Sequence, residues 1–145
     1  MDHIDLLKIA IVLVVMSTGV YAPMSDAQVK AAGKLVRNVC QPKNKATDED
    51  IDKMHQGDWN IDHTAMCYMH CVLTSQKLIT KENNLDYDVA MNAAKTKLPV
   101  TIRDGTLVTI EQCKDSAKTL TDKCVAAYEI SKCLYEANPQ IYFLP

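Results

Sequence analysis

Apolar residues recur at steps of three and four positions in several stretches of the chain, which is the spacing of one face of an α-helix. In the first such stretch, Leu35, Val36 and Val39 follow this pattern. Residues that can cap a helix start precede most of these stretches, and Pro, Gly or Asn follow them. Pro42 and Pro99 are expected to end the first and the fourth helix. The pattern predicts six helices, at about 25–40, 47–57, 62–76, 86–97, 102–117 and 121–137.

The segment from Val100 to Ile110 is less clear, because it is rich in β-branched residues. A short strand there is an alternative to the first part of the fifth helix. An isolated strand would have no partner elsewhere in the chain, so a helix is favoured. This helix would begin at Ile102 or Thr106, and the expected fold class is all-α.

An uncharged apolar run, Ile9 to Met16, lies near the start of the chain. It is too short to cross a bilayer, which takes about 20 residues, but it fits the apolar part of a secretory signal peptide. Ala22 is a suitable cleavage position, and Gly19 is an alternative one. We therefore expect a signal peptide at 1–22, which is removed, and a secreted, extracellular domain at 23–145. A buried N-terminal helix or strand is the alternative.

The charge of the chain is nearly balanced, with 16 Lys and Arg against 18 Asp and Glu. A nucleic-acid-binding domain would be strongly basic, so no nucleic acid is expected as a partner. No second apolar run is long enough for a membrane span, and stable membrane insertion is not expected. The chain lacks a G-x-S-x-G motif, and its cysteines are better explained as disulfides than as nucleophiles. We expect neither catalysis nor a cofactor.

The cysteines are the most informative residues. An even number of cysteines in a secreted chain indicates disulfides, and six cysteines allow 15 pairings. Cys67 and Cys71 are four residues apart on one predicted helix, so their Cβ atoms lie about 5–6 Å apart, too far for a bond to each other. They are expected to bond to two neighbouring helices. His70 raises the alternative of a zinc site, but oxidised sulfurs are not thiolate ligands, so no metal is expected. The six are Cys40, Cys67, Cys71, Cys113, Cys124 and Cys133.

The spacing Cys-x26-Cys-x3-Cys-x41-Cys-x10-Cys-x8-Cys resembles that of the insect odorant-binding proteins, the pheromone and general odorant-binding protein family. Other segments also match, and the resemblance covers the whole predicted mature chain. It implies a compact bundle of six helices around a hydrophobic cavity. It also implies three disulfides, Cys40–Cys71, Cys67–Cys124 and Cys113–Cys133. The matching segments are Gly57-Asp58-Trp59, Met66-Cys67-Tyr68 and Tyr142-Phe143-Leu144-Pro145.

The resemblance further implies a secreted carrier that binds small hydrophobic odorants or pheromones reversibly and delivers them to olfactory receptors. Leu134, the residue after the sixth cysteine, occupies a position that commonly faces the ligand in the family. The other lining candidates are chosen by helical face, and ordinary core packing is the alternative for each. They are Met69, Leu73 and Thr74 on the third helix, Tyr87, Met91, Ala94 and Leu98 on the fourth, Val108 on the fifth, and Ala127, Ile130 and Ser131 on the sixth.

Asn138-Pro139 ends the last predicted helix and leaves an apolar tail, 141–145. In the family, a tail of this length folds over the pocket as a lid. By this resemblance Tyr142 and Phe143 would contact the ligand, and the Pro145 carboxylate would form a hydrogen bond inside. Such a lid would loosen when the carboxylate is protonated, so ligand release at low pH is expected. A frayed terminus is the alternative.

Two other functions fit the sequence less well. A carrier of lipophilic molecules in haemolymph, gut or reproductive fluid would use the same fold in another tissue. A disulfide-rich helical protein that perturbs membranes would have different cysteine spacing. None of the lining candidates is Lys or Arg, which favours neutral alcohols, esters, aldehydes or terpenes over free acids as ligands. A monomer and a homodimer are both compatible with the sequence.

Overall fold

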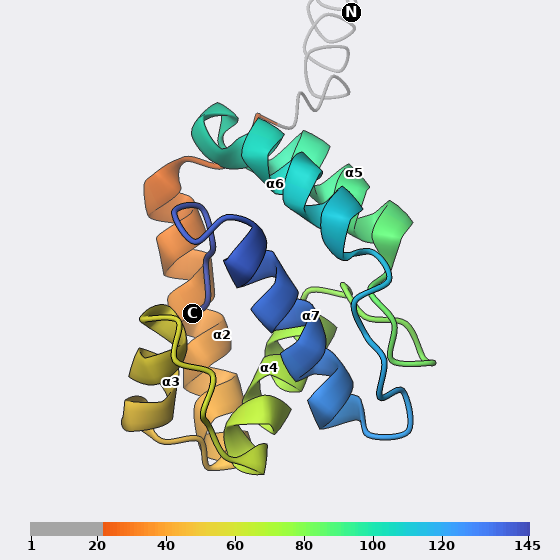
Figure 1. Cartoon of the computed structure of the whole chain (residues 1–145). Coiled ribbons are helices and arrows are strands. Elements are labelled where there is room, and N and C mark those ends of the chain that lie inside the picture. Colours follow the sequence, from red (N-terminus) through yellow and green to blue (C-terminus); the bar gives the residue numbers. More distant parts are fainter. Residues whose placement is uncertain (1–21) are drawn as a thin grey trace, which may run out of the picture.

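The computed structural model describes residues 22–145, so the predicted signal peptide lies outside the described residues except for Ala22. Within this range the chain forms six α-helices (Figure 1). The predicted all-α fold is confirmed. The helices are α2 (Asp26–Asn44), α3 (Asp48–His55), α4 (His63–Ser75), α5 (Tyr87–Lys97), α6 (Val100–Cys113) and α7 (Lys123–Ala137).

Side-chain caps fix the starts of most of these helices. At α2, the backbone N–H of Gln28 donates to Ser25 Oγ (3.3 Å), and the backbone N–H of Ser25 donates to Gln28 Oε1 (2.8 Å). At α4, Asp62 Oδ1 accepts from the backbone N–H groups of Thr64 (2.8 Å) and Ala65 (3.1 Å). Each of these bonds satisfies a backbone group that has no partner inside its helix. The capping residues therefore explain why the helices begin near the predicted positions.

The prediction that Pro42 ends the first helix is wrong. α2 continues past Pro42 to Asn44, and Lys45 then adopts a left-handed conformation with φ 56°. A proline removes one backbone hydrogen bond of a helix, but here the last turn is held in another way. The Asn44 side chain donates to the Cys40 carbonyl (2.8 Å), and the Lys45 N–H reaches the carbonyls of the preceding turn.

The β-branched segment after Pro99 forms the first turns of α6, so the strand alternative is wrong. The helix begins at Val100 and ends at Cys113, which is earlier at both ends than predicted. Leu98 has an extended backbone with ψ 147°, the conformation that a following proline favours. Pro99 therefore separates α5 from α6, as predicted.

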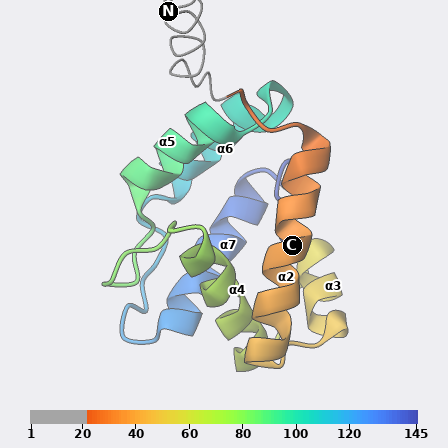
Figure 2. The same cartoon turned by 180° about the vertical axis from the view of Figure 1, so that it is seen from behind.

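The helices α4 and α7 form the centre of the bundle. α2 packs on α4, and α6 packs on α7. α5 packs against α6. Figures 1 and 2 show this arrangement from opposite sides, with α4 and α7 between α2 and the α5–α6 pair. Large, fully buried side chains of the core come from the central pair and from α3. They include Ile51, Met54, Tyr68, Met69 and Ile130.

Three disulfides connect the helices with the predicted pairing. Cys40–Cys71 joins α2 to α4, Cys67–Cys124 joins α4 to α7, and Cys113–Cys133 joins α6 to α7. No free cysteine remains among residues 22–145. Cys67 and Cys71 bond to different helices, as their spacing on one helix predicts.

The C-terminal tail folds back onto α2, α3 and α4. The Tyr68 hydroxyl donates to the Pro145 oxygen, and His55 Nε2 lies 2.9 Å from the Leu144 carbonyl oxygen. Phe143 packs so closely on Gly33 of α2 that any Cβ at this position would collide with its ring. Leu144 and Pro145 are buried. The tail is thus docked by specific contacts, which differs from the frayed terminus considered as the alternative.

Candidate functional site

The interior between α4 and α7 brings together the candidates predicted from these two helices. Met69 and Leu73 lie four residues apart on α4 and are buried. Ala127, Ile130 and Ser131 of α7 are buried as well, and the apolar members belong to the same core cluster as Met69 and Leu73. The spacing therefore predicted the buried faces of both helices, and ligand contact by these residues stays a prediction.

The helix α5 and the tail complete this interior. Ala94 is buried in the same cluster, and Tyr87, Met91 and Leu98 pack against it in half-buried positions. Leu134 of α7 and Tyr142 of the tail also pack against the cluster. We call these residues, together with those of α4 and α7, the apolar interior. An empty volume between them stays a prediction. The members are Met69, Leu73, Tyr87, Met91, Ala94, Leu98, Ala127, Ile130, Ser131, Leu134 and Tyr142.

Three predicted candidates lie elsewhere. Thr74 is exposed, although Leu73 beside it is buried. Val108 is 57% exposed, whereas the inner face of α6 carries Ile110. Phe143 is 44% exposed and packs on α2. Adjacent residues of a helix point about 100° apart, so an error of one position in the expected face moves a side chain from the interior to the surface.

Tyr68 and Tyr142 place two tyrosine hydroxyls at the apolar interior and its edge, beside the Ser131 hydroxyl. Burial raises the pKa of Tyr68 to about 12. Burial also raises the pKa of Tyr142, and its hydrogen bond with Ser131 opposes this effect. Both hydroxyls are therefore neutral at physiological pH and can act as hydrogen-bond donors. One holds the end of the tail, and the other ties the tail to α7.

Two further polar groups border the apolar interior, and the sequence analysis assigned neither of them to the site. Trp59 Nε1 and Arg103 Nε are buried without a hydrogen-bond partner among residues 22–145. The Trp59 ring makes an edge-to-face contact with Tyr142, with ring centroids 6.3 Å apart. Arg103 Nη2 donates to the Leu98 carbonyl oxygen (2.9 Å). Because Trp59 is the only tryptophan of the chain, its identity was a usable signal, whereas nothing in the sequence distinguished Arg103.

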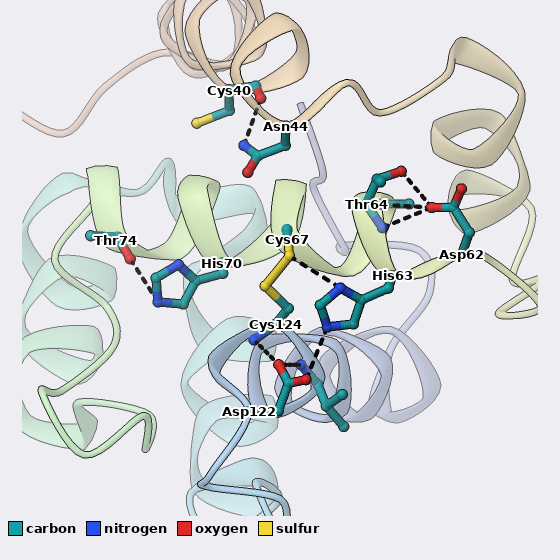
Figure 3. Close-up of a disulfide and its surroundings, with 12 residues drawn as sticks. Cys40, Asn44, Asp62, His63, Thr64, Cys67, His70, Thr74, Asp122 and Cys124 are labelled. Carbon is teal, nitrogen blue, oxygen red and sulfur yellow. Dashed lines mark hydrogen bonds and ion pairs between the residues drawn. A yellow bond between two sulfur atoms is a disulfide. The ribbon is translucent and has the colours of Figure 1, made fainter.

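A second group of chemically notable side chains surrounds the Cys67–Cys124 disulfide (Figure 3). His63 Nδ1 lies 3.7 Å from Cys67 Sγ, and His63 Nε2 lies 2.9 Å from Asp122 Oδ2. These residues form a histidine–cysteine cluster of a size that could surround a metal ion. However, the two sulfurs are bonded to each other, so they are not thiolate ligands. His70, the histidine considered for a zinc site, lies beside Thr74 instead (3.5 Å).

The structure is a small all-α domain, braced by three disulfides and with its C-terminal tail docked on the bundle. The chain belongs to the PBP/GOBP family, the pheromone and general odorant-binding proteins, which it matches over residues 22–137. The resemblance inferred from the cysteine spacing is therefore confirmed. This family consists of carriers of small hydrophobic molecules, not of enzymes. Within residues 22–145, no helix has the length and apolar content that a membrane crossing needs.

Individual relatives support the assignment. General odorant-binding protein 72 of Anopheles gambiae is 28% identical over 120 residues, which covers 83% of this chain and 98% of the relative. The crystal structure of Odorant Binding Protein 4 from the predator Chrysopa pallens is 41% identical with a TM-score of 0.78, and covers 84% of this chain and 99% of that one. Odorant binding protein 5 of Apis mellifera is 27% identical with a TM-score of 0.77. The match covers 85% of this chain and 99% of that one.

Proposed function

We propose that this protein is a secreted extracellular carrier that binds small hydrophobic odorants or pheromones in the apolar interior and delivers them to olfactory receptors. The observation that carries the proposal is the meeting of the predicted lining residues from α4, α5, α7 and the tail around one core. Membership of a family of small-molecule carriers supports it independently. A monomer or homodimer would serve this function equally well.

The apolar interior suits ligands that are apolar and carry one oxygen. Its methionines, Met69 and Met91, have flexible and polarizable side chains that can adjust to guests of different shape. The Trp59 Nε1–H is buried without an acceptor, a costly state that a ligand oxygen would relieve. None of the interior candidates is Lys or Arg. Neutral alcohols, aldehydes, esters and terpenes are therefore the proposed ligand class.

We propose that the tail acts as the lid and releases ligand at low pH. The Pro145 oxygen accepts a hydrogen bond from Tyr68 of α4, and the positively charged Arg37 of α2 lies near enough to act on the Tyr68 pKa. A carboxylate at this position accepts such a bond as an anion and holds it more weakly once protonated. His55 Nε2 of α3 lies 2.9 Å from the neighbouring Leu144 carbonyl oxygen and adds a second contact to the tail.

The binding proposal is tested by displacing the fluorescent probe N-phenyl-1-naphthylamine with neutral alcohols and aldehydes. Met91→Glu places a charge against the apolar interior and is expected to lower affinity about ten-fold or more. Val89→Glu, on the same helix but 39% exposed, is the matched control and should bind like the original protein. Equal affinity in both variants would contradict binding in the interior. Met91→Ala, with near-ultraviolet circular dichroism, checks that the result does not come from unfolding.

The lid proposal is tested with the chain shortened by residues 141–145. The full chain should lose affinity between neutral and mildly acidic pH, and the shortened chain should bind weakly at both. If the two chains show the same affinities at both pH values, the tail is not the lid. That outcome would leave ligand binding in the interior intact, so the two proposals can fail separately.

A further inference from the structure

A groove of about 670 Å³ lies on the outside of the bundle, along α2 and α4 and at the start of α7. This volume is within the range of about 300–1,000 Å³ that small-molecule sites occupy. Figure 2 shows α2 and α4 side by side, and residues of both helices line the groove. The groove is lined by residues of α4 that differ from those facing the apolar interior: His70 and Thr74 line the groove, whereas Met69 and Leu73 are buried. The groove is therefore separate from the apolar interior.

The floor of this outer groove is apolar and accessible. Leu35 and Val39 are 68% and 65% exposed, which is unusual for large aliphatic side chains on the same helix face. Val36 lies beside them, and the Cys40–Cys71 disulfide continues the floor from α2 to α4. The bridge fixes the two walls of the groove relative to each other. Apolar surface is thus presented to solvent on a rigid frame.

The side of the groove toward α7 is positively charged. Lys43 at the end of α2 and Lys123 at the start of α7 both line it, and no Asp or Glu is among the lining residues. Neither lysine forms an ion pair within residues 22–145. His70 lines the groove with them, and burial and then the charges of Lys123 and Lys43 lower its pKa. The nearby Asp122 is engaged with His63 and with the N-terminal N–H groups of α7.

We propose that the outer groove binds a free long-chain carboxylate, with the alkyl chain on Leu35 and Val39 and the carboxylate between Lys43 and Lys123. The lining combines exposed aliphatic side chains with two lysines, which complements an amphiphilic anion and not a neutral volatile molecule. The ligand class of the groove is thus distinct from that proposed for the apolar interior.

A free anion fits the groove better than an anionic membrane surface. The whole chain has a net charge of -2, so the two lysines form a local positive site on a molecule that a negatively charged surface repels. The groove is also concave, whereas apolar residues that enter a bilayer project from a surface. The occupant is therefore a single molecule that enters the groove.

The proposal is tested by nuclear magnetic resonance with ¹⁵N-labelled protein saturated with 1-dodecanol. Dodecanoate, added below its micellar concentration, should shift the amide signals of Val39, Lys43 and Thr74, and further 1-dodecanol should not. The double variant Lys43→Gln/Lys123→Gln should weaken this second binding about five-fold. The matched control Lys30→Gln/Lys81→Gln removes the same charge from exposed positions outside the groove. It should change the dodecanoate affinity less than two-fold. Raising the salt concentration should weaken binding to the original protein.

A second pair of variants separates the floor from the charges. Val39→Glu should abolish the dodecanoate shifts, and Val100→Glu, at an exposed valine of α6, should not. The proposal is overturned if the shifts are confined to the apolar interior, if 1-dodecanol binds the groove equally well, or if both lysine double variants lose the same affinity. It is also overturned if only phosphatidylserine vesicles bind in a Lys43- and Lys123-dependent way, because the groove would then contact membranes.

Discussion

The apolar interior and the outer groove share one helix and differ in almost every other respect. In α4, Met69 and Leu73 face the core with no more than 7% exposure, whereas His70 and Thr74, one position further on, line the groove. The interior contains neutral tyrosine hydroxyls, and the groove contains charged lysines. A rotation of about 100° around one helix axis is therefore enough to separate two chemically distinct surfaces.

The two proposed sites would let a small protein select between two kinds of hydrophobic molecule. A closed interior removes all of the ligand from water, so a charge on the ligand would be costly there. An open groove leaves one end of the ligand hydrated and adds cations at that end, so it tolerates a charge. Variants that act on one surface and leave the other unchanged can test this separation.

The largest expected effect comes from the disulfide that joins the two central helices. Cys67→Ser/Cys124→Ser should lower the free energy of unfolding by about 3–5 kcal/mol, because the bridge closes a loop of 57 residues, and should weaken binding at both surfaces. Cys113→Ser/Cys133→Ser opens a loop of only 20 residues, so its cost should be about 1 kcal/mol smaller. Urea unfolding measures both. The opposite order would show that strain or residual structure, not loop length, determines the cost.

The next effect compares packing in the two regions directly. Ile130→Ala removes a fully buried side chain and should lower the free energy of unfolding by about 2–4 kcal/mol. Val39→Ala, at the 65% exposed groove position, should change it by less than about 0.5 kcal/mol. If both substitutions have the same small cost, the interior is not tightly packed without a ligand. Thermal unfolding with and without 1-dodecanol then shows whether a guest restores the difference.

Alkaline pH should affect the apolar interior through Tyr68. The Tyr68 pKa of about 12 in the folded protein exceeds the ordinary value of 10, so the folded state keeps a proton that the unfolded state loses. The contribution of Tyr68 to the free energy of unfolding is complete below pH 10 and is lost as the pH rises toward 12. The loss at pH 11 is about 1 kcal/mol. Tyr142 acts in the same direction. Tyr68→Phe should flatten this pH dependence in urea unfolding, and an unchanged slope would exclude Tyr68 as its source.

The smallest expected effect concerns the charge next to Lys123. The hydrogen bond from His63 is the first cause that lowers the pKa of Asp122, so this carboxylate is ionised at neutral pH. Asp122→Asn keeps an oxygen that can cap α7 but removes the negative charge. Dodecanoate affinity for the groove should rise about two-fold, because a repulsive charge is removed in a solvated environment. Displacement of N-phenyl-1-naphthylamine from the interior should not change, and a parallel change would mean that the two surfaces are not independent.

Much of the fold could be predicted because its determinants are local. Capping residues such as Ser25 and Asp62 and apolar steps of three and four specify helices without any tertiary information. The fate of Pro42 could not be predicted in this way. Its tolerance depends on the Asn44 side chain and on the left-handed Lys45, which compensate within the last turn.

The sites were less predictable, since periodicity marks a helix face but not what covers it. Leu35 and Val39 have the same spacing as the buried residues of α4, but no element of the described chain packs over them. The groove also needs Lys123, which lies about 80 residues after Lys43 and is brought close only by two disulfides. Similarly, Arg103 reaches the interior through a contact with the Leu98 backbone that sequence spacing does not encode.

The three disulfides have a consequence for how the bundle can open. They tie α2, α4, α7 and α6 into one covalent series and leave α3, α5 and the last residues outside it. Breathing motions that break no bond are therefore concentrated in the unlinked segments, and amide hydrogen exchange should be fastest there. Since α5 and the tail both border the apolar interior, guests would come and go past these movable parts while the outer groove keeps its shape.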